Sequence, residues 1–306
     1  MSFNAVSQRL QPRRFIAFLT AATRKMSTDF NSIRYEVADR VATITLNRPE
    51  RANAIDEHMP FEIESAVQLA NFDESVRVIR LTGSGKFFCA GYDLKKYAEG
   101  ERGSVHGSQK MPWDPYVDYQ WMHKATEAYM SLWRSLKPTV VEINGDCIAG
   151  GSDIALCCDV SFIADDALIG YPPARIWGCP TGAMWYYRLG LEKAKRMLLT
   201  GALVSGEKAV EMGLIGECAP RDQLSSVVDD FVAKMVDIPT NQLWMQKTVI
   251  NNAVEMQGLF NTQRLAVLFD GMSRHTPEGV AFQKEAELHG FKAAIAKLRG
   301  KIGSKL

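Results

Sequence analysis

Apolar and polar positions follow two periodicities along the first part of the chain, one typical of strands and one typical of helices. Residues 35–46 (YEVADRVATITL) alternate with period two and are rich in Val, Ile and Thr, which predicts a β-hairpin. Residues 53–72 carry apolar side chains at helical spacing and predict an amphipathic helix. Residues 76–82 (VRVIRLT) predict a buried strand that a glycine turn closes.

Strand and helix patterns continue to alternate before giving way to helices. We expect an irregular aromatic segment over residues 113–121 and then a helix over residues 123–136. A strand over residues 139–143, a helix over residues 152–158 and a strand over residues 160–163 are expected to follow. Beyond Ser205 the pattern is helical, with no strong strand signal. β/α repeats followed by a helical tail predict an α/β fold whose remaining helices gather at the C-terminus.

Composition excludes several classes of protein. The 306 residues include 36 Lys and Arg against 35 Asp and Glu, so the formal charge of +1 gives no basic excess for nucleic acid. No apolar stretch approaches the roughly 18 residues of a membrane span. The six cysteines lack C-x-x-C spacing and the five histidines lack H-E-x-x-H spacing, so no metal site is expected. The cysteines are predicted to be small buried hydrophobes in a reducing compartment.

Both ends of the chain resemble targeting signals. Residues 1–28 contain five basic residues and no acid before Asp29, as in a mitochondrial transit peptide, although Met26 also opens a plausible shorter chain. The final tripeptide has the sequence of a peroxisomal signal and consists of Ser304, Lys305 and Leu306. We therefore expect the peroxisomal import receptor as a partner and the peroxisome as the location, with the mitochondrion as the alternative.

Two glycine turns are the strongest candidates for chemistry. Residues 88–94 (FCAGYDL) and 144–153 (NGDCIAGGSD) each predict a strand, a tight glycine turn and the start of a helix. Such a turn leaves free backbone N–H groups at the positive end of a helix. If both turns converged, they would form an oxyanion hole for an ester or thioester carbonyl. Neither turn matches the glycine motifs that bind nucleotide phosphates.

Four ordered segments resemble the crotonase, or enoyl-CoA hydratase/isomerase, superfamily. They are residues 41–55, 76–94, 137–160 and 199–215. The resemblance implies a spiral of ββα repeats followed by a C-terminal helical trimerisation region, with trimers often paired into hexamers. We therefore expect a leader outside the fold over residues 1–28, a crotonase-like core over residues 29–225 and a C-terminal helical region over residues 226–306.

The resemblance also implies a substrate and an oxyanion hole. An acyl-CoA thioester would bind with its carbonyl oxygen accepting hydrogen bonds from the backbone N–H groups of Tyr92 and Gly150. Because coenzyme A is then part of the substrate, no separate cofactor is expected. Further implied substrate contacts are Arg51, Ala52, Ala54, Ala90, Asp93, Leu94 and Lys284. Lys284 would reach the 3′-phosphate of coenzyme A from a neighbouring subunit.

The sequence departs from the hydratase pattern at the catalytic carboxylates. A two-carboxylate hydratase has one Glu after its second glycine turn and another beside a later proline, and together they move the protons of water addition. Here Asp153 occupies the first position. The second position falls on Pro173 or Ala174, depending on the register, and neither is an acid.

This departure leaves several functions open. With Tyr171 or Arg175 assisting, Asp153 would hydrate a 2-enoyl-CoA or shift its double bond. Alternatively, the protein is a hydrolase or C–C lyase of a branched or cyclic CoA ester, in which Asp153 acts with a polar side chain such as Asp114, Asp118 or His123. A third hypothesis is a catalytically impaired member that only binds CoA esters, with Asp153 capping a helix. Arg175 would favour a substrate with a second acid group if it faced the cavity.

Overall fold

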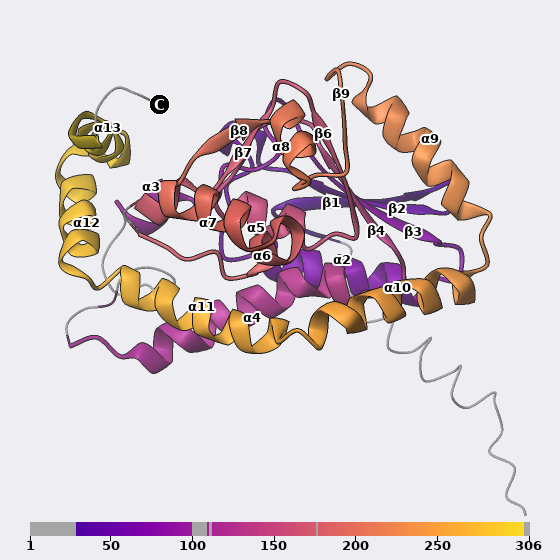
Figure 1. Ribbon diagram of the computed structural model, residues 1–306, viewed down its shortest axis with the longest axis horizontal. Coiled ribbons are helices and arrows are strands. Elements are labelled where there is room, and N and C mark those ends of the chain that lie inside the picture. The colour runs from indigo at the N-terminus through magenta and orange to yellow at the C-terminus, as the bar shows by residue number, and fades with distance from the viewer. Residues whose placement is uncertain (1–28, 100–108, 110–111, 176, 303–306) are drawn as a thin grey trace, which may run out of the picture.

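Two β-sheets and the helices around them make up the part of the chain that the structure describes. This computed structural model describes residues 29–99, 109, 112–175 and 177–302 (Figure 1). The larger sheet has the order β1-β2-β3-β4-β6-β9 and consists of Ile33–Ala38, Val41–Leu46, Val78–Gly83, Thr139–Ile143, Val160–Ala164 and Glu217–Ala219. Strand β1 is antiparallel to β2, and the other neighbours are parallel.

The smaller sheet lies beside the larger one and alternates with it along the chain. It has the order β5-β7-β8, formed by Cys147–Ile148, Leu168–Gly170 and Leu203–Ser205. From β4 the chain enters β5, and from β6 it enters β7, so successive turns place one strand in each sheet. This confirms the predicted spiral with strand pairs followed by helices.

The helices between the strands are mostly short, whereas those after β9 are long. The first group comprises α2 (Met59–Phe72), α3 (Leu94–Tyr97), α4 (Pro115–Arg134), α5 (Gly150–Leu156), α6 (Met184–Leu189), α7 (Leu191–Thr200), α8 (Gly206–Met212) and the 3₁₀ turns η1 (Pro49–Arg51) and η2 (Pro172–Arg175). The C-terminal group comprises α9 (Leu224–Val236), α10 (Thr240–Glu255), α11 (Leu259–Ser273), α12 (Pro277–His289) and α13 (Phe291–Ile302).

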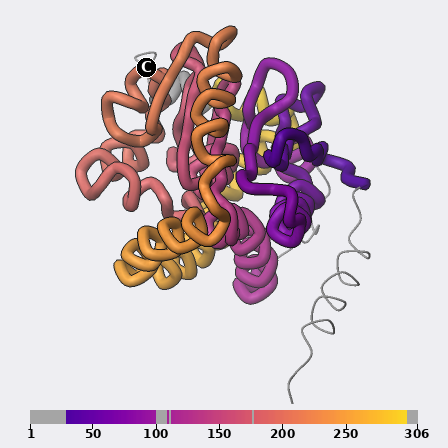
Figure 2. The backbone as a smooth tube through the Cα atoms, turned by 90° about the vertical axis from the view of Figure 1, so that its right-hand side faces the viewer, coloured from indigo at the N-terminus to yellow at the C-terminus, as the bar shows by residue number. Residues whose placement is uncertain are grey.

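Helix α11 returns to the core instead of extending away from it. It packs against α4, and both run below the sheets in Figure 1. Figure 2 shows the orange C-terminal helices and the indigo N-terminal strands on different sides of the molecule. All five residues of β4 are buried, as expected for a parallel strand covered on both faces. Helix α11 also contributes Asp270 to the cavity that residues of both glycine turns line.

The predicted hairpin and the predicted strands over residues 139–143 and 160–163 are confirmed. The helix predicted over residues 53–72 begins later, at Met59. The reason is that Ala52 and Asn53 both have a φ of +51°, which a right-handed helix cannot include.

Two further expectations about the elements are wrong. The aromatic segment over residues 113–121 is not irregular but opens α4, since Pro115 is its first residue and the Asp114 side chain caps its N-terminus by accepting from Tyr116 N–H. The chain beyond Ser205 also contains a strand, because the three residues of β9 pair with β6. So short a strand carries too little periodicity to be read from sequence.

The predicted ends and subunits stay predictions. Residues 1–28 and the tripeptide Ser304, Lys305 and Leu306 lie outside the described residues. The proposed boundary after residue 225 falls inside α9, so no loop separates the two parts there. Within the described ranges, no helix combines the length and apolarity needed to cross a membrane.

Candidate active site

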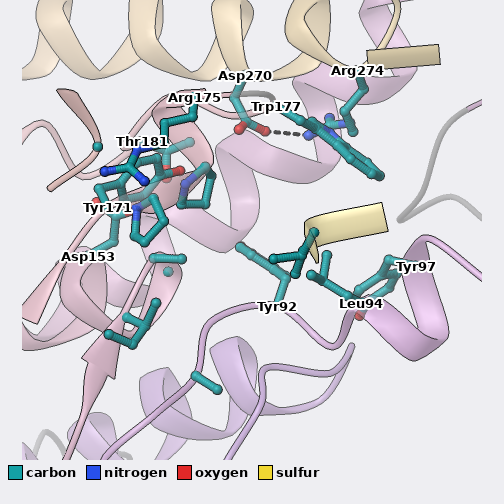
Figure 3. Close-up of a pocket in the computed structure, with 18 of the residues that line it drawn as sticks. Tyr92, Leu94, Tyr97, Asp153, Tyr171, Arg175, Trp177, Thr181, Asp270 and Arg274 are labelled. Atoms are coloured by element: carbon teal, nitrogen blue, oxygen red, sulfur yellow. Dashed lines mark hydrogen bonds and ion pairs between the residues drawn. The ribbon is translucent and has the colours of Figure 1, made fainter. Parts of the chain in front are cut away.

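A cavity of about 900 Å³ lies where the two glycine turns, α5 and α11 meet. The predicted site residues that line it are Ala90, Tyr92, Leu94, Gly150, Asp153, Tyr171 and Arg175. The predicted site residues that do not line it are Arg51, Ala52, Ala54, Asp93 and Lys284. In Figure 3, Asp270 and Arg274 enter from above, Tyr171 and Asp153 lie at one side, and Tyr92 lies below.

The two glycine turns approach each other closely at the cavity wall. Gly91 has a φ of +87°, and a Cβ placed on it would lie 2.8 Å from Ala149 Cβ and 3.2 Å from Gly150 N. Gly150 begins α5, so its N–H has no partner within the helix. Among the described residues, neither Gly150 N–H nor Tyr92 N–H donates a hydrogen bond to another protein group. Two unpartnered backbone donors therefore lie on neighbouring segments of one cavity.

Asp153 lies in α5 and is only 3% exposed. The alternative that it caps this helix is wrong, because Ala149 holds the N-cap position and no side chain caps there. Its Oδ1 atom is buried without a hydrogen-bond partner. Burial raises the pKa of Asp153 well above its ordinary value, and the charge of Asp270 raises it further, against the lowering effect of the backbone N–H groups of Gly182 and Thr181.

Asp270 is a second carboxylate in the cavity that sequence reasoning missed. It comes from α11, is 6% exposed and accepts a hydrogen bond at Oδ1 from Cys179 N–H, at 3.1 Å. Its Oδ2 pairs with Arg274 one helical turn later, and Arg274 also lies 3.5 Å from Asp118. The available signal was an acid directly after the apolar run of residues 265–269, with a base four residues later.

Arg175 and Tyr171 border the cavity in different ways. Arg175 is half-buried, and its Nε donates to the carbonyl oxygen of Thr200 at 2.6 Å. Arg175 is not among the groups that shift the pKa of Asp153. Tyr171 is buried, and burial followed by the charges of Asp153 and Asp270 raises the pKa of its hydroxyl. Its hydroxyl therefore stays a proton donor at neutral pH.

The other suggested partners of Asp153 lie outside the cavity lining. Asp114 caps α4, and His123 stacks on Tyr119 at a centroid distance of 5.5 Å. Asp118 is buried beside Arg274 but does not line the cavity. None of these three side chains is placed to act with Asp153 on a bound substrate.

Arg51 is already paired within the same chain. Its guanidinium bonds both oxygens of Asp93, at 2.7 and 3.2 Å, and Asp93 also caps α3 through Lys96 N–H. The carbonyl oxygen of Ala52 accepts from Ala90 N–H at 3.0 Å and so holds this loop against the first glycine turn. The loop thus supports the cavity wall from behind.

The prediction of buried cysteines is confirmed for four of the six. Cys89, Cys147, Cys157 and Cys158 are buried and form no disulfide, whereas Cys179 and Cys218 are partly exposed. Burial raises the pKa of Cys89 to about 12, so its thiol stays protonated and unreactive. Over the described ranges, no group of three or more His, Cys, Asp or Glu side chains is arranged to hold a metal ion.

Comparison with known proteins identifies the family. A profile of the enoyl-CoA hydratase/isomerase family matches residues 36–285. The hydroxycinnamoyl-CoA hydratase-lyase of Pseudomonas fluorescens is 30% identical over 213 residues, which are 68% of this chain and 74% of the relative. An enoyl-CoA hydratase from Mycobacterium smegmatis, known from its crystal structure, is 42% identical in sequence to this chain. The two structures superpose with a TM-score of 0.83 over 90% of this chain and 95% of that one. An enoyl-CoA hydratase/isomerase from Xanthobacter autotrophicus Py2 is 28% identical, with a TM-score of 0.82 over 90% and 100% of the two chains. The chain is therefore an enzyme of the enoyl-CoA hydratase/isomerase family, within the crotonase superfamily.

Proposed function

We propose that this enzyme hydrates 2-enoyl-CoA thioesters, with Tyr92 N–H and Gly150 N–H as the oxyanion hole. The observation that carries the proposal is the juxtaposition of these two unpartnered donors with the buried Asp153 in one cavity. Backbone donors are fixed before the substrate arrives, so they stabilise developing negative charge without reorganising.

The chemistry follows from where charge develops. Addition at the β-carbon places negative charge on the thioester oxygen, which the two N–H groups stabilise as an enolate. Asp153, kept protonated by burial, then delivers its proton to the α-carbon. The reaction needs no dissociable cofactor, since coenzyme A is part of the substrate. A double-bond shift would use the same enolate and the same proton carrier.

The remaining contacts to coenzyme A stay part of the proposal. Ala90 and Leu94 line the cavity and would contact the thioester and pantetheine. Arg51 is already paired with Asp93, whose negative charge offsets part of the guanidinium's charge. Its attraction for a phosphate of coenzyme A would therefore be weaker than that of a free guanidinium. Lys284 is exposed on α12 and would act from a neighbouring subunit, as the family resemblance implies.

The direct test is turnover of crotonyl-CoA by the purified full chain, followed by the loss of absorbance of the conjugated thioester. We expect hydration, and product analysis will separate it from a double-bond shift. Activity that survives incubation with EDTA supports a reaction carried by backbone and carboxyl groups. Tight binding of several acyl-CoA esters without turnover of any would support the impaired, binding-only alternative.

The hydration rate is expected to fall as pH rises through the raised pKa of Asp153, because only the protonated form can supply the α-proton. Besides burial, the group that acts on Asp153 is Asp270 across the cavity, while Gly182 and Thr181 N–H oppose the shift. The measurement is kcat against pH at saturating substrate. A rate that rises throughout the neutral and alkaline range would contradict the assignment of Asp153 as the acid.

Cleavage of an aryl-substituted substrate is a second candidate function. The cavity lining includes an aromatic group made up of Tyr92, Tyr97, Trp121, Trp177 and Phe282. The Pseudomonas relative is named as a hydratase-lyase of hydroxycinnamoyl-CoA, and such lining would suit a planar acyl group. Incubation with a cinnamoyl-type CoA ester distinguishes the two, since a lyase releases an aromatic aldehyde and a simple hydratase stops at the hydroxyacyl product.

A further inference from the structure

We propose that Asp270 is the catalytic base that activates water for attack on the β-carbon of the substrate. It would replace, from a distant helix, the carboxylate that residues 170–178 lack. This inference rests on the proposed function, because it assigns the second proton-transfer group of the same hydration.

Asp270 reaches the end of the segment where the second carboxylate is missing. Its Oδ1 accepts from the N–H of Cys179, 91 residues earlier and directly after that segment. A Cβ placed on Gly178 would lie 3.5 Å from Asp270 Oδ1 and 3.2 Å from the Tyr171 hydroxyl. Asp270 therefore lies beside this segment in space and shares the cavity with Asp153 (Figure 3).

The ion pair with Arg274 does not by itself account for Asp270. The Arg274 side chain is only 11% exposed and lies against two carboxylates, Asp270 and Asp118. Asp118 lies 3.5 Å from the guanidinium, supplies a second negative charge beside it and stays outside the cavity lining. Burying an additional carboxylate is unfavourable, and such an arrangement is typical of functional sites.

The bonds to Asp270 leave it able to accept a proton. Each carboxylate oxygen can accept two hydrogen bonds, and Oδ1 and Oδ2 each have one protein donor, Cys179 N–H and Arg274. Both donors fix the orientation of the carboxylate, and a water in the cavity can use the remaining positions. The pair of carboxyl groups is also asymmetric, since Asp270 has a cation beside it and Asp153 has a partnerless Oδ1. Two carboxyl groups in contrasting environments are suited to act as base and acid.

The proton balance of the step is complete. Asp270 accepts a proton from water as the water oxygen bonds to the β-carbon, and the electron pair of the double bond moves into the thioester as an enolate. As the enolate collapses, the α-carbon takes the proton of Asp153. Asp270 is then protonated and Asp153 is ionised, and a proton returned from Asp270 to Asp153 through water in the cavity restores the starting state.

The test separates water addition from α-proton chemistry. Hydration of crotonyl-CoA needs both carboxyl groups. Exchange of the α-hydrogens of butyryl-CoA in D₂O needs only the oxyanion hole and the ionised fraction of Asp153, which removes an α-hydrogen and returns a deuteron to the enolate. We expect Asp270→Asn to lower kcat for hydration by about 10²–10⁴-fold and to leave α-exchange within about tenfold of wild type. Asp153→Asn is expected to lose both reactions.

Asp118→Asn is the matched control, because it removes the other buried carboxylate beside Arg274 and Asp118 does not itself line the cavity. We expect it to lower thermal stability and to retain most of the hydration rate. If Asp270→Asn does not fold, Asp270→Glu keeps the charge but moves the carboxylate, and reduced hydration with retained α-exchange is then the expected result.

Near-wild-type hydration by a folded Asp270 variant would overturn the assignment, and so would an equal loss of hydration and α-exchange. Failure of the wild-type enzyme in both reactions would instead count against the proposed function, so the two failures are distinguishable.

Discussion

Asp153→Asn is expected to lower kcat for hydration by about 10²–10⁴-fold while the protein stays folded. The amide has nearly the shape of the carboxyl group, and its oxygen can accept from Thr181 and Gly182 N–H, but it carries no proton for the α-carbon. The measurement is steady-state kinetics with crotonyl-CoA beside a thermal melt. Hydration at near the wild-type rate would show that another group delivers the proton.

The same substitution is expected to make the protein more stable at neutral pH. Because the folded-state pKa of Asp153 is raised, its contribution to stability is full at low pH and declines as pH rises above the ordinary carboxyl pKa of 3.8. Asparagine does not titrate, so the variant escapes this decline. The difference in Tm between variant and wild type should therefore increase as pH rises from about 4 towards neutrality. A constant difference would mean that Asp153 is not held in its acid form.

Gly91→Ala is expected to lower kcat by about 10²–10³-fold, the usual effect of losing one oxyanion donor. The new Cβ would lie 2.8 Å from Ala149 Cβ and 3.0 Å from the carbonyl oxygen of Ile148, and the backbone must shift to relieve the contact. That shift moves Tyr92 N–H away from Gly150 N–H. Steady-state kinetics on an acyl-CoA substrate would show the loss mainly in kcat.

Gly213→Ala is the matched control for backbone strain. Gly213 has a φ of +81°, close to the +87° of Gly91, but an added Cβ there meets no atom within 4 Å. Each alanine should cost about 1–2 kcal/mol from the left-handed conformation, whereas only Gly91→Ala should lose activity. Equal activity in the two variants would rule out the close approach of the two turns as the basis of the oxyanion hole.

Local patterns predicted the parts of the site that adjacent residues build. The two glycine turns and Asp153 each lie within one short segment, so their strand, turn and helix signals are continuous in sequence. Family resemblance added Tyr92 N–H and Gly150 N–H as an oxyanion hole, and the structure brings both to one cavity.

Asp270 could not be predicted in the same way, because its place depends on how α11 packs against α4. Nothing in the residues around Asp270 indicates that they meet Cys179 across 91 positions of chain. The apolar periodicity of α11 indicated only a packed helix. Likewise, Arg51 and Asp93 were both assigned to coenzyme A, and only the folded chain shows that they bind each other.

The i, i+4 spacing of Asp270 and Arg274 has a consequence for how reactions diversify in this family. One face of one helix carries both the charged group at the cavity and its counter-ion, and neither glycine turn belongs to that helix. Exchanging residues 259–274, which are α11 and its C-cap, between relatives would move or remove this pair as a unit and leave both glycine turns in place. A chimera that receives only this segment from a relative is expected to carry out a different reaction on the same acyl-CoA.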